Sequence, residues 1–241
     1  MGDEAEAERL PPHRLLSVIV PVYNERATVA EIIRRMRRVE LPLDLEIVMV
    51  DDGSSDGTEK ILAALEDSTV QVVRHATNRG KGAAVRSGLT ACRGDLVLIQ
   101  DADLEYDPQD WHLLLEPVLE GDATIVYGSR FTEGRPGVRL STRLGRRCMS
   151  LATDLLFDTK VSDIECGYKL FDRRVLDGIV IESDRFAFEP EITAKVLRAG
   201  GRLHEVPVTY VPRTLDEGRK YSFQDRFRTL WALVRFGWKG R

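Results

Sequence analysis

Three carboxylates alternate along one short segment of the chain. Asp101, Asp103 and Glu105 occupy every second position shortly after the apolar run Leu96–Ile99. Alternate side chains of an extended backbone point to the same side, so the three carboxylates are expected on one face. Carboxylates this close repel one another unless a cation lies among them, and Mg²⁺ and Mn²⁺ prefer oxygen ligands and often bridge to substrate phosphates. The triplet therefore predicts a divalent metal site, with a solvated acidic loop as the alternative.

A glycine-rich segment, NRGKG, precedes a stretch of helical character. Gly80, Lys81 and Gly82 resemble a phosphate-binding loop, in which backbone N–H groups and an ammonium oppose negative charge. The segment matches neither the Walker A pattern nor GxGxxG, because Val85 stands where the third glycine would be. It is therefore a weak indication of phosphate binding, and it argues against a dinucleotide-dependent oxidoreductase.

Asp52 follows another apolar run and opens onto the segment VDDGSSDGT. A carboxylate at a strand end can accept hydrogen bonds from a nucleoside base or ribose. The alternative is that Asp52 forms an Asx turn, and the residues alone favour this structural role.

Five short runs rich in β-branched residues must position these groups. They are predicted to be strands in the middle of a parallel sheet, because they are apolar on both faces. Polar segments come soon after four of these runs. In open α/β sheets, ligands bind at the carboxyl ends of the strands, which is where these segments are expected. The five runs are Val18–Val20, Ile47–Val50, Val70–Val73, Leu96–Ile99 and Ile125–Tyr127.

Helical patterns alternate with these strands. Thr28 and Glu31 have the spacing of a capping box, Asp56 is expected to begin a second helix, and Asp107 before Pro108 is a strong start signal for a third. The alternation predicts an α/β sandwich with right-handed crossovers. Helices near 141–157 and 189–199, an apolar segment at 166–171 and a strand near 202–211 are expected to complete the same single domain.

Composition narrows the class of protein. The 35 basic and 39 acidic residues give a net charge of −4, which excludes a broadly basic nucleic-acid-binding surface. Cys92, Cys148 and Cys166 form no CxxC pair, which favours a reducing compartment and argues against a zinc site. No run of 18 apolar residues exists, so a cytoplasmic location is expected.

The two ends of the chain differ from the middle. Residues 1–14 are predicted to be a flexible leader, residues 15–220 a catalytic domain, and residues 221–241 an amphipathic helix. The segment 219–241 contains seven basic residues and one acid together with a stripe of aromatic and aliphatic side chains. Packing of this stripe on the domain is the favoured interpretation, and a peripheral contact with the inner face of an anionic membrane is the alternative.

Eight motifs in order resemble family 2 glycosyltransferases, and specifically the dolichyl- and polyprenyl-phosphate mannosyl- and glucosyltransferases. The resemblance covers roughly residues 16–235 and implies a GT-A fold, a Rossmann-like nucleotide-binding sandwich. It also implies inverting transfer of a sugar from a UDP- or GDP-linked donor. The motifs are PVYNE, VDDGSSDGT, NRGKG, DADLEYDP, GSR, DIECGYKLF, FAFEPEITAK and EVPVTYVPR.

The resemblance also implies roles for individual residues. Many relatives carry Gln where this chain has Glu105. Pro21, Tyr23, Glu25 and Asp52 are expected to hold the nucleoside, Lys81 to lie near the donor, and Asp101, Asp103 and Glu105 to hold Mg²⁺ or Mn²⁺ with the diphosphate.

The acceptor decides whether a catalytic base is needed. A polyprenyl phosphate is already an anionic nucleophile, whereas a hydroxyl acceptor must lose a proton to a carboxylate. The family alignment makes Asp163 the candidate for that carboxylate, with Glu165 as the competitor. Four further cations are candidates for binding an acceptor phosphate or the donor diphosphate, namely Arg130, Arg213, Arg219 and Lys220.

Three hypotheses remain at this point. The first is a metal-dependent inverting hexosyltransferase that acts on a polyprenyl phosphate at the cytoplasmic face of a membrane. The second is transfer to a soluble hydroxyl acceptor, such as a natural product or polysaccharide precursor. The third is a non-catalytic module that binds nucleotide sugars, against which the intact pair Asp101 and Asp103 counts.

Overall fold

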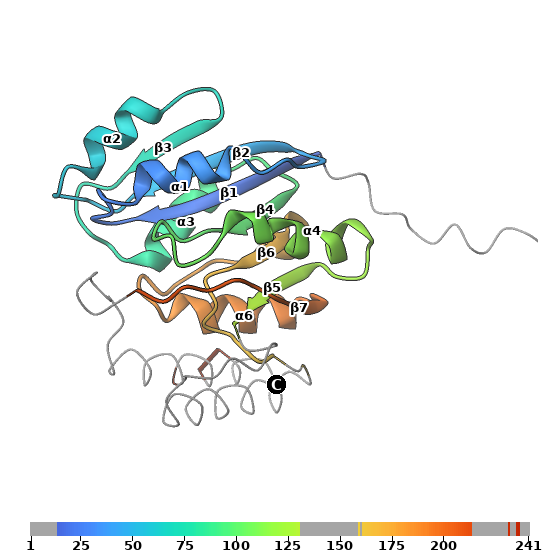
Figure 1. The fold of residues 1–241 in the computed structure, drawn as a ribbon. Helices are drawn as coiled ribbons and strands as arrows, with labels where there is room; N and C mark the ends of the chain where they lie inside the picture. Colours follow the sequence, from blue (N-terminus) through green and yellow to red (C-terminus); the bar gives the residue numbers. More distant parts are fainter. Residues whose placement is uncertain (1–13, 131–158, 160, 214–230, 232–234, 237–241) are drawn as a thin grey trace, which may run out of the picture.

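A computed structural model of the chain describes residues 14–130, 159, 161–213, 231, 235 and 236. A seven-stranded sheet in the order β3-β2-β1-β4-β6-β5-β7 runs through the molecule (Figure 1). The strands are β1 (Leu15–Val22), β2 (Asp44–Asp51), β3 (Val70–Arg74), β4 (Leu96–Ile99), β5 (Ile125–Ser129), β6 (Lys169–Asp172) and β7 (Leu203–Pro207).

All strands except β6 run in the same direction, because β6 pairs antiparallel with both β4 and β5. The described helices are α1 (Val29–Met36), α2 (Thr58–Leu65), α3 (Lys81–Ala91), α4 (Trp111–Leu119) and α6 (Phe188–Arg198), with 3₁₀ turns η1 (Pro108–Asp110) and η2 (Arg173–Leu176). The mostly parallel α/β sandwich in a single domain confirms the predicted fold class.

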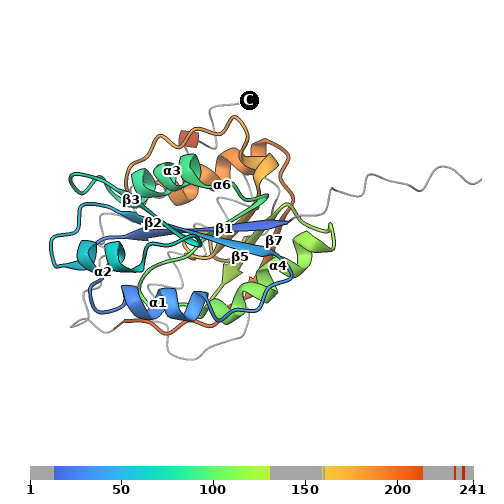
Figure 2. The ribbon, with the colours of Figure 1, turned by 90° about the horizontal axis from the view of Figure 1, so that it is seen from above.

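The helices cover both faces of the sheet. Helices α3 and α6 lie side by side on one face, and α1 and α4 lie on the other (Figure 2). One core, which includes Ile32 and Trp111, fills the space beneath α1, α2 and α4. A second core, which includes Val85 and Phe188, lies beneath α3 and α6. The sheet is therefore buried on both sides, and its carboxyl-terminal edge remains free to carry a site.

The predicted strand Leu96–Ile99 agrees with β4, and the other four runs lie within longer strands. The prediction that all five occupy the middle of the sheet is wrong for Val70–Val73, because β3 is an edge strand. Its exposed Gln71 alternates with buried neighbours, as expected where one face meets solvent. The apolar segment 166–171 contributes only its last residues to β6.

The helix starts were predicted with mixed success. Asp107 accepts a hydrogen bond from the Gln109 backbone N–H (3.1 Å) and Pro108 begins η1, which confirms that start. The capping box is wrong, since the Thr28 hydroxyl donates to Glu25 (2.8 Å) and Glu31 pairs with arginines of its own helix.

Asp56 lies two residues before the start of α2 and accepts from the Thr58 N–H (3.0 Å). The predicted helix near 141–157, the leader up to residue 13 and most of the 221–241 segment lie outside the described residues. Within the described part of the chain, no helix combines the length and apolar character needed to cross a bilayer.

Candidate functional site

A cavity of about 300 Å³ opens where the carboxyl ends of β1, β2 and β4 meet. Seven of the predicted site residues line it, namely Pro21, Tyr23, Glu25, Asp52, Lys81, Asp101 and Asp103. Asn78, Arg185 and Phe186, which sequence reasoning did not single out, line it as well. Glu105, Arg130, Asp163 and Arg213 lie outside its walls, and Arg219 and Lys220 lie outside the described residues.

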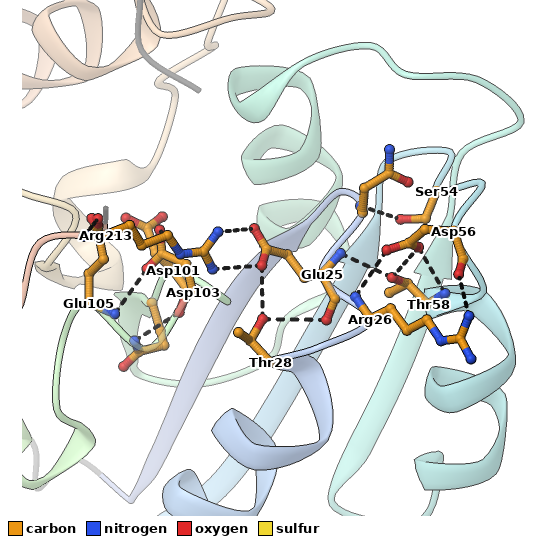
Figure 3. A network of polar contacts seen from close by, with 12 residues as sticks. Glu25, Arg26, Thr28, Ser54, Asp56, Thr58, Asp101, Asp103, Glu105 and Arg213 are labelled. Atoms are coloured by element: carbon orange, nitrogen blue, oxygen red, sulfur yellow. Dashed lines mark hydrogen bonds and ion pairs between the residues drawn. The ribbon is translucent and has the colours of Figure 1, made fainter. Parts of the chain in front are cut away.

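The carboxylate triplet lies on a turn and not on an extended strand. Leu104 adopts a left-handed conformation (φ 46°), and the Glu105 N–H donates to Asp103 Oδ1 (3.2 Å). The expected extended backbone is therefore wrong, although the turn still brings Asp101, Asp103 and Glu105 together (Figure 3).

Asp103 is the carboxylate most affected by this crowding. Burial raises its pKa, and the charges of Asp101 and Glu105 raise it further, to about 7. A carboxyl group in this environment is stabilised as an anion when a cation arrives. The carboxylate oxygens of Asp101 and Asp103 are therefore suitable ligands for a hard divalent ion, which agrees with the predicted metal site.

The protein does not supply a complete coordination shell. Among the described residues, no three His, Cys, Asp or Glu side chains are arranged to hold a metal ion. A metal at Asp101 and Asp103 would need further oxygen ligands from water or from a substrate phosphate, as is common for Mg²⁺.

Glu105 contacts a neighbouring segment with both of its carboxylate oxygens. It accepts hydrogen bonds from the Tyr210 hydroxyl (3.2 Å) and the Arg213 N–H (2.8 Å), and its own carbonyl accepts from the Val211 N–H (2.8 Å). These bonds connect the segment after β7 to the turn that carries Asp101, Asp103 and Glu105. Glu105 therefore stabilises this contact, and its role as a metal ligand stays a prediction.

Lys81 lies between two carboxylates at the start of α3. Its Nζ is 2.8 Å from Asp101 and 3.1 Å from Glu189. Burial by itself lowers the pKa of Lys81, but the two carboxylates raise it well above its ordinary value, so the ammonium stays charged. Glu189 was missed as a site residue, because nothing local in the sequence indicates a pair that joins the first turn of α6 to α3.

Arg213 reaches the same region from the segment after β7. Its guanidinium donates two hydrogen bonds to Glu25 (3.2 and 2.7 Å) and lies 4.0 Å from Asp103 (Figure 3). Glu25 also accepts from Thr28. The predicted phosphate-binding arginine is thus already paired with a predicted nucleoside-binding residue.

Asp52 is fixed at the cavity wall by three hydrogen bonds. It accepts from the Arg79 N–H (2.9 Å) and the Gly80 N–H (2.7 Å), and it contacts His75 Nδ1 (2.6 Å). In this segment Asp51 accepts from the backbone three residues further along, at the Ser54 N–H (3.0 Å), and Asp52 does not, so the Asx turn predicted for Asp52 is wrong. Asp52 therefore holds the glycine-rich segment in place.

The glycines of that segment allow another part of the backbone to approach closely. A Cβ atom at Gly82 or Gly80 would lie closer than 3.0 Å to the carbonyl oxygens of Ser183 and Asp184 respectively. The Asp184 carbonyl also accepts from the Ala83 N–H (3.0 Å) at the start of α3. Close approach of two backbones accounts for these glycines, and phosphate binding by the segment stays a prediction.

Arg130 and Asp163 form a buried ion pair outside the cavity. The Arg130 guanidinium donates to both carboxylate oxygens (2.6 and 2.7 Å), and it lies over the Tyr210 ring (5.1 Å from the carbon Cζ to the centroid). Both side chains are largely buried. Asp163 is thus already engaged, and its role as a catalytic base stays a prediction that would require Arg130 to release it.

Replacing Asp163 with alanine is expected to lower the free energy of unfolding by about 3–5 kcal/mol, because Arg130 would remain buried without its partner. Urea denaturation measures this loss. The double variant Arg130→Met with Asp163→Leu should recover most of it. A loss below about 1 kcal/mol for Asp163→Ala would show that the pair does not stabilise the fold.

Comparison with known proteins places the chain in a family. The model of glycosyl transferase family 2 matches residues 17–180, more than half of the chain. Glycosyltransferase AglJ of Haloferax volcanii is 31% identical over 207 residues, which are 85% of this chain and 65% of that protein. An undecaprenyl-phosphate 4-deoxy-4-formamido-L-arabinose transferase of Pseudomonas aeruginosa is 31% identical over 230 residues, 92% of this chain and 65% of that protein. The chain spans about two thirds of the length of these relatives.

Solved structures show the same fold. Glucosyl-3-phosphoglycerate synthase from Mycobacterium tuberculosis, crystallised with Mn²⁺, UDP and phosphoglyceric acid, has a TM-score of 0.71 at 20% identity, covering 93% of this chain and 78% of that one. Its complex with Mg²⁺ and UDP has a TM-score of 0.71 at 23% identity, covering 92% and 79%. The fold is GT-A, and the chain belongs to glycosyltransferase family 2.

Proposed function

We propose that the protein is a metal-dependent, inverting hexosyltransferase that moves a sugar from a UDP- or GDP-linked donor to a polyprenyl phosphate. The observation that carries this proposal is the single cavity that joins Asp52 and Tyr23 to Asp101 and Asp103. A polyprenyl phosphate acceptor is supported by the similarity to an undecaprenyl-phosphate sugar transferase. A nucleotide-linked donor and a divalent metal are supported by the Mn²⁺ or Mg²⁺ and UDP bound in the structural neighbours.

Different residues of the cavity would bind different parts of the donor. Asp52, fixed by two backbone N–H groups, would accept hydrogen bonds from the nucleoside, together with Pro21 and Tyr23. Asp101 and Asp103 would hold Mg²⁺ or Mn²⁺, which neutralises negative charge as the diphosphate leaves. Lys81, whose charged form the neighbouring Asp101 and Glu189 favour, would add a second cation there.

The acceptor would attack from the opposite face of the sugar. A phosphate nucleophile carries its own charge, so no side chain needs to remove a proton. This fits the engagement of Asp163 with Arg130, because the reaction then does not depend on a free carboxylate there. A polyprenyl phosphate acceptor implies that the protein acts at a membrane surface. We propose that the protein contacts the cytoplasmic face of that membrane peripherally.

A transfer assay with and without chelation tests the proposal. The purified chain receives labelled UDP- and GDP-sugars with either detergent-solubilised undecaprenyl phosphate or a panel of hydroxyl acceptors. A labelled lipid product that disappears with EDTA and returns with Mn²⁺ or Mg²⁺ is expected, since the carboxylates alone do not neutralise the leaving group.

The other outcomes identify the alternatives. A product with a hydroxyl acceptor only would favour the soluble-acceptor hypothesis. Donor binding with neither transfer nor hydrolysis would indicate a non-catalytic binding module. Full activity after thorough chelation would overturn the metal-dependent mechanism.

A further inference from the structure

Among the described residues, the cations Lys81 and Arg185 line the cavity, and Arg213 lies beside it against Glu25 and Asp103. Lys81 is paired with Asp101 and Glu189, and Arg213 is paired with Glu25. Arg185 lines the cavity and is exposed. Its side chain makes no hydrogen bond, ion pair or ring contact with any residue in the described ranges.

The loop that carries Arg185 is held firmly at its N-terminal end. Glu191, completely buried on α6, accepts hydrogen bonds from the N–H groups of Glu182 (2.6 Å) and Ser183 (2.8 Å). Arg86 on α3 donates to the Ile181 carbonyl (2.8 Å) and to the Asp184 carboxylate (2.6 Å). These contacts join the loop to both helices of one face.

The tip of the loop is held against the start of α3. The Asp184 carbonyl accepts from the Ala83 N–H (3.0 Å), and Gly80 and Gly82 leave the space that this approach requires. The stem of Arg185 lies directly over Gly80, since a Cβ there would be 2.8 Å from Arg185 Cγ. Helices α3 and α6 lie side by side around this contact (Figure 2).

The loop therefore brings the Arg185 guanidinium to the cavity, where Lys81 is already paired with Asp101 and Glu189. Gly80, over which the Arg185 stem lies, donates its N–H to Asp52 and directly precedes Lys81, and all four residues line the cavity. A guanidinium binds phosphate oxygens with two parallel hydrogen bonds, and a loop fixed in advance loses little freedom on binding.

We propose that Arg185 binds a phosphate group of a substrate in this cavity. The inference rests on the proposed function, because that function supplies the two phosphate groups that Arg185 could bind. These are the donor diphosphate and the acceptor phosphate. Both present the same chemistry to the guanidinium, and separate measurements distinguish them.

The test compares Arg185→Gln with Arg38→Gln, which removes an exposed arginine just after α1, outside the cavity lining. Calorimetry with UDP and GDP in Mn²⁺ reports the donor, and the KM for undecaprenyl phosphate reports the acceptor. Arg185→Gln is expected to weaken one of them about 10-fold to 100-fold, because it loses charge-assisted hydrogen bonds. Arg185→Lys should restore part of the loss, and the melting temperature should not change.

The outcomes separate the two sources and the two proposals. A loss confined to nucleoside diphosphate affinity assigns the donor, and a loss confined to the acceptor KM assigns the acceptor. Affinity and KM both within twofold of wild type overturn the inference, as does an equal loss in Arg38→Gln. If the wild-type chain binds UDP but transfers no sugar, the proposed function fails while the calorimetric measurement on Arg185 still gives an answer.

Discussion

Asp103→Asn is expected to lower turnover by at least about 10³-fold, because the variant would lose a carboxylate that we propose to hold the metal at the leaving diphosphate. The metal-dependent part of donor affinity should fall with it. Steady-state kinetics over a Mn²⁺ titration, together with calorimetry for UDP, measures both effects. Wild-type turnover with unchanged Mn²⁺ dependence would contradict the assignment.

The same substitution should stabilise the metal-free protein above neutral pH. Burial and two neighbouring carboxylates raise the folded pKa of Asp103 from 3.8 to about 7. A group with a raised folded pKa contributes its stability fully below the unfolded pKa and loses it as the pH rises through the folded value. Asparagine does not ionise, so at pH 8 the variant should be about 4 kcal/mol more stable to urea.

Asp107→Asn is the matched control for both effects. Asp107 belongs to the same acidic segment, but it caps η1 and does not line the cavity. Its substitution should leave turnover within a few-fold of wild type and change stability by no more than about 1 kcal/mol, because asparagine also caps helices. An equal loss of turnover in the two variants would show that the segment responds to any loss of charge.

Gly167→Ala is expected to reduce kcat about 100-fold although it replaces none of the predicted ligands, because small displacements of catalytic groups are costly. A Cβ at residue 167 would lie closer than 3.0 Å to Asp101 Oδ2 and 2.9 Å from Tyr106 Cε2. The Asp101 carboxylate would have to move, and its 2.8 Å contact with Lys81 would be broken. The rate should be measured at saturating donor and Mn²⁺, so that weaker binding does not hide the effect.

Gly201→Ala gives a comparable clash elsewhere. Its Cβ would lie closer than 3.0 Å to Ile125 Cδ1 and 2.8 Å from the Val196 carbonyl, in the core beneath α6. This variant should lose stability and keep the kcat of the folded fraction. If Gly167→Ala behaved in the same way, Asp101 would not need its present position for catalysis.

Local features of the sequence predicted much of the fold. The β4 strand and the start at Asp107 were identified correctly, because a buried apolar run and an Asp-Pro pair depend on neighbouring residues. The capping box failed because other local partners compete for the same side chains. The Thr28 hydroxyl donates to Glu25, three residues earlier, and Glu31 pairs with Arg34 and Arg35 within one helical turn.

The site was predicted less completely than the fold. The strand-end rule brought Asp52 and Asp101 to one cavity, since parallel strands end at one edge. The partners of these residues come from distant segments, as when Glu189 reaches Lys81 and Arg213 reaches Glu25. Such pairs depend on how the last third of the chain packs, and no spacing in the sequence indicates them.

The order of the strands has a consequence for synthesis of the chain. Strand β5 is made before β6 and β7, and these two are its partners in the sheet. Until residue 172 has left the ribosome, β4 presents an open edge and β5 has no partner at all. Exposed edges of this kind favour aggregation, so the nascent polypeptide is expected to be more prone to aggregate at this stage than after β6 and β7 have paired.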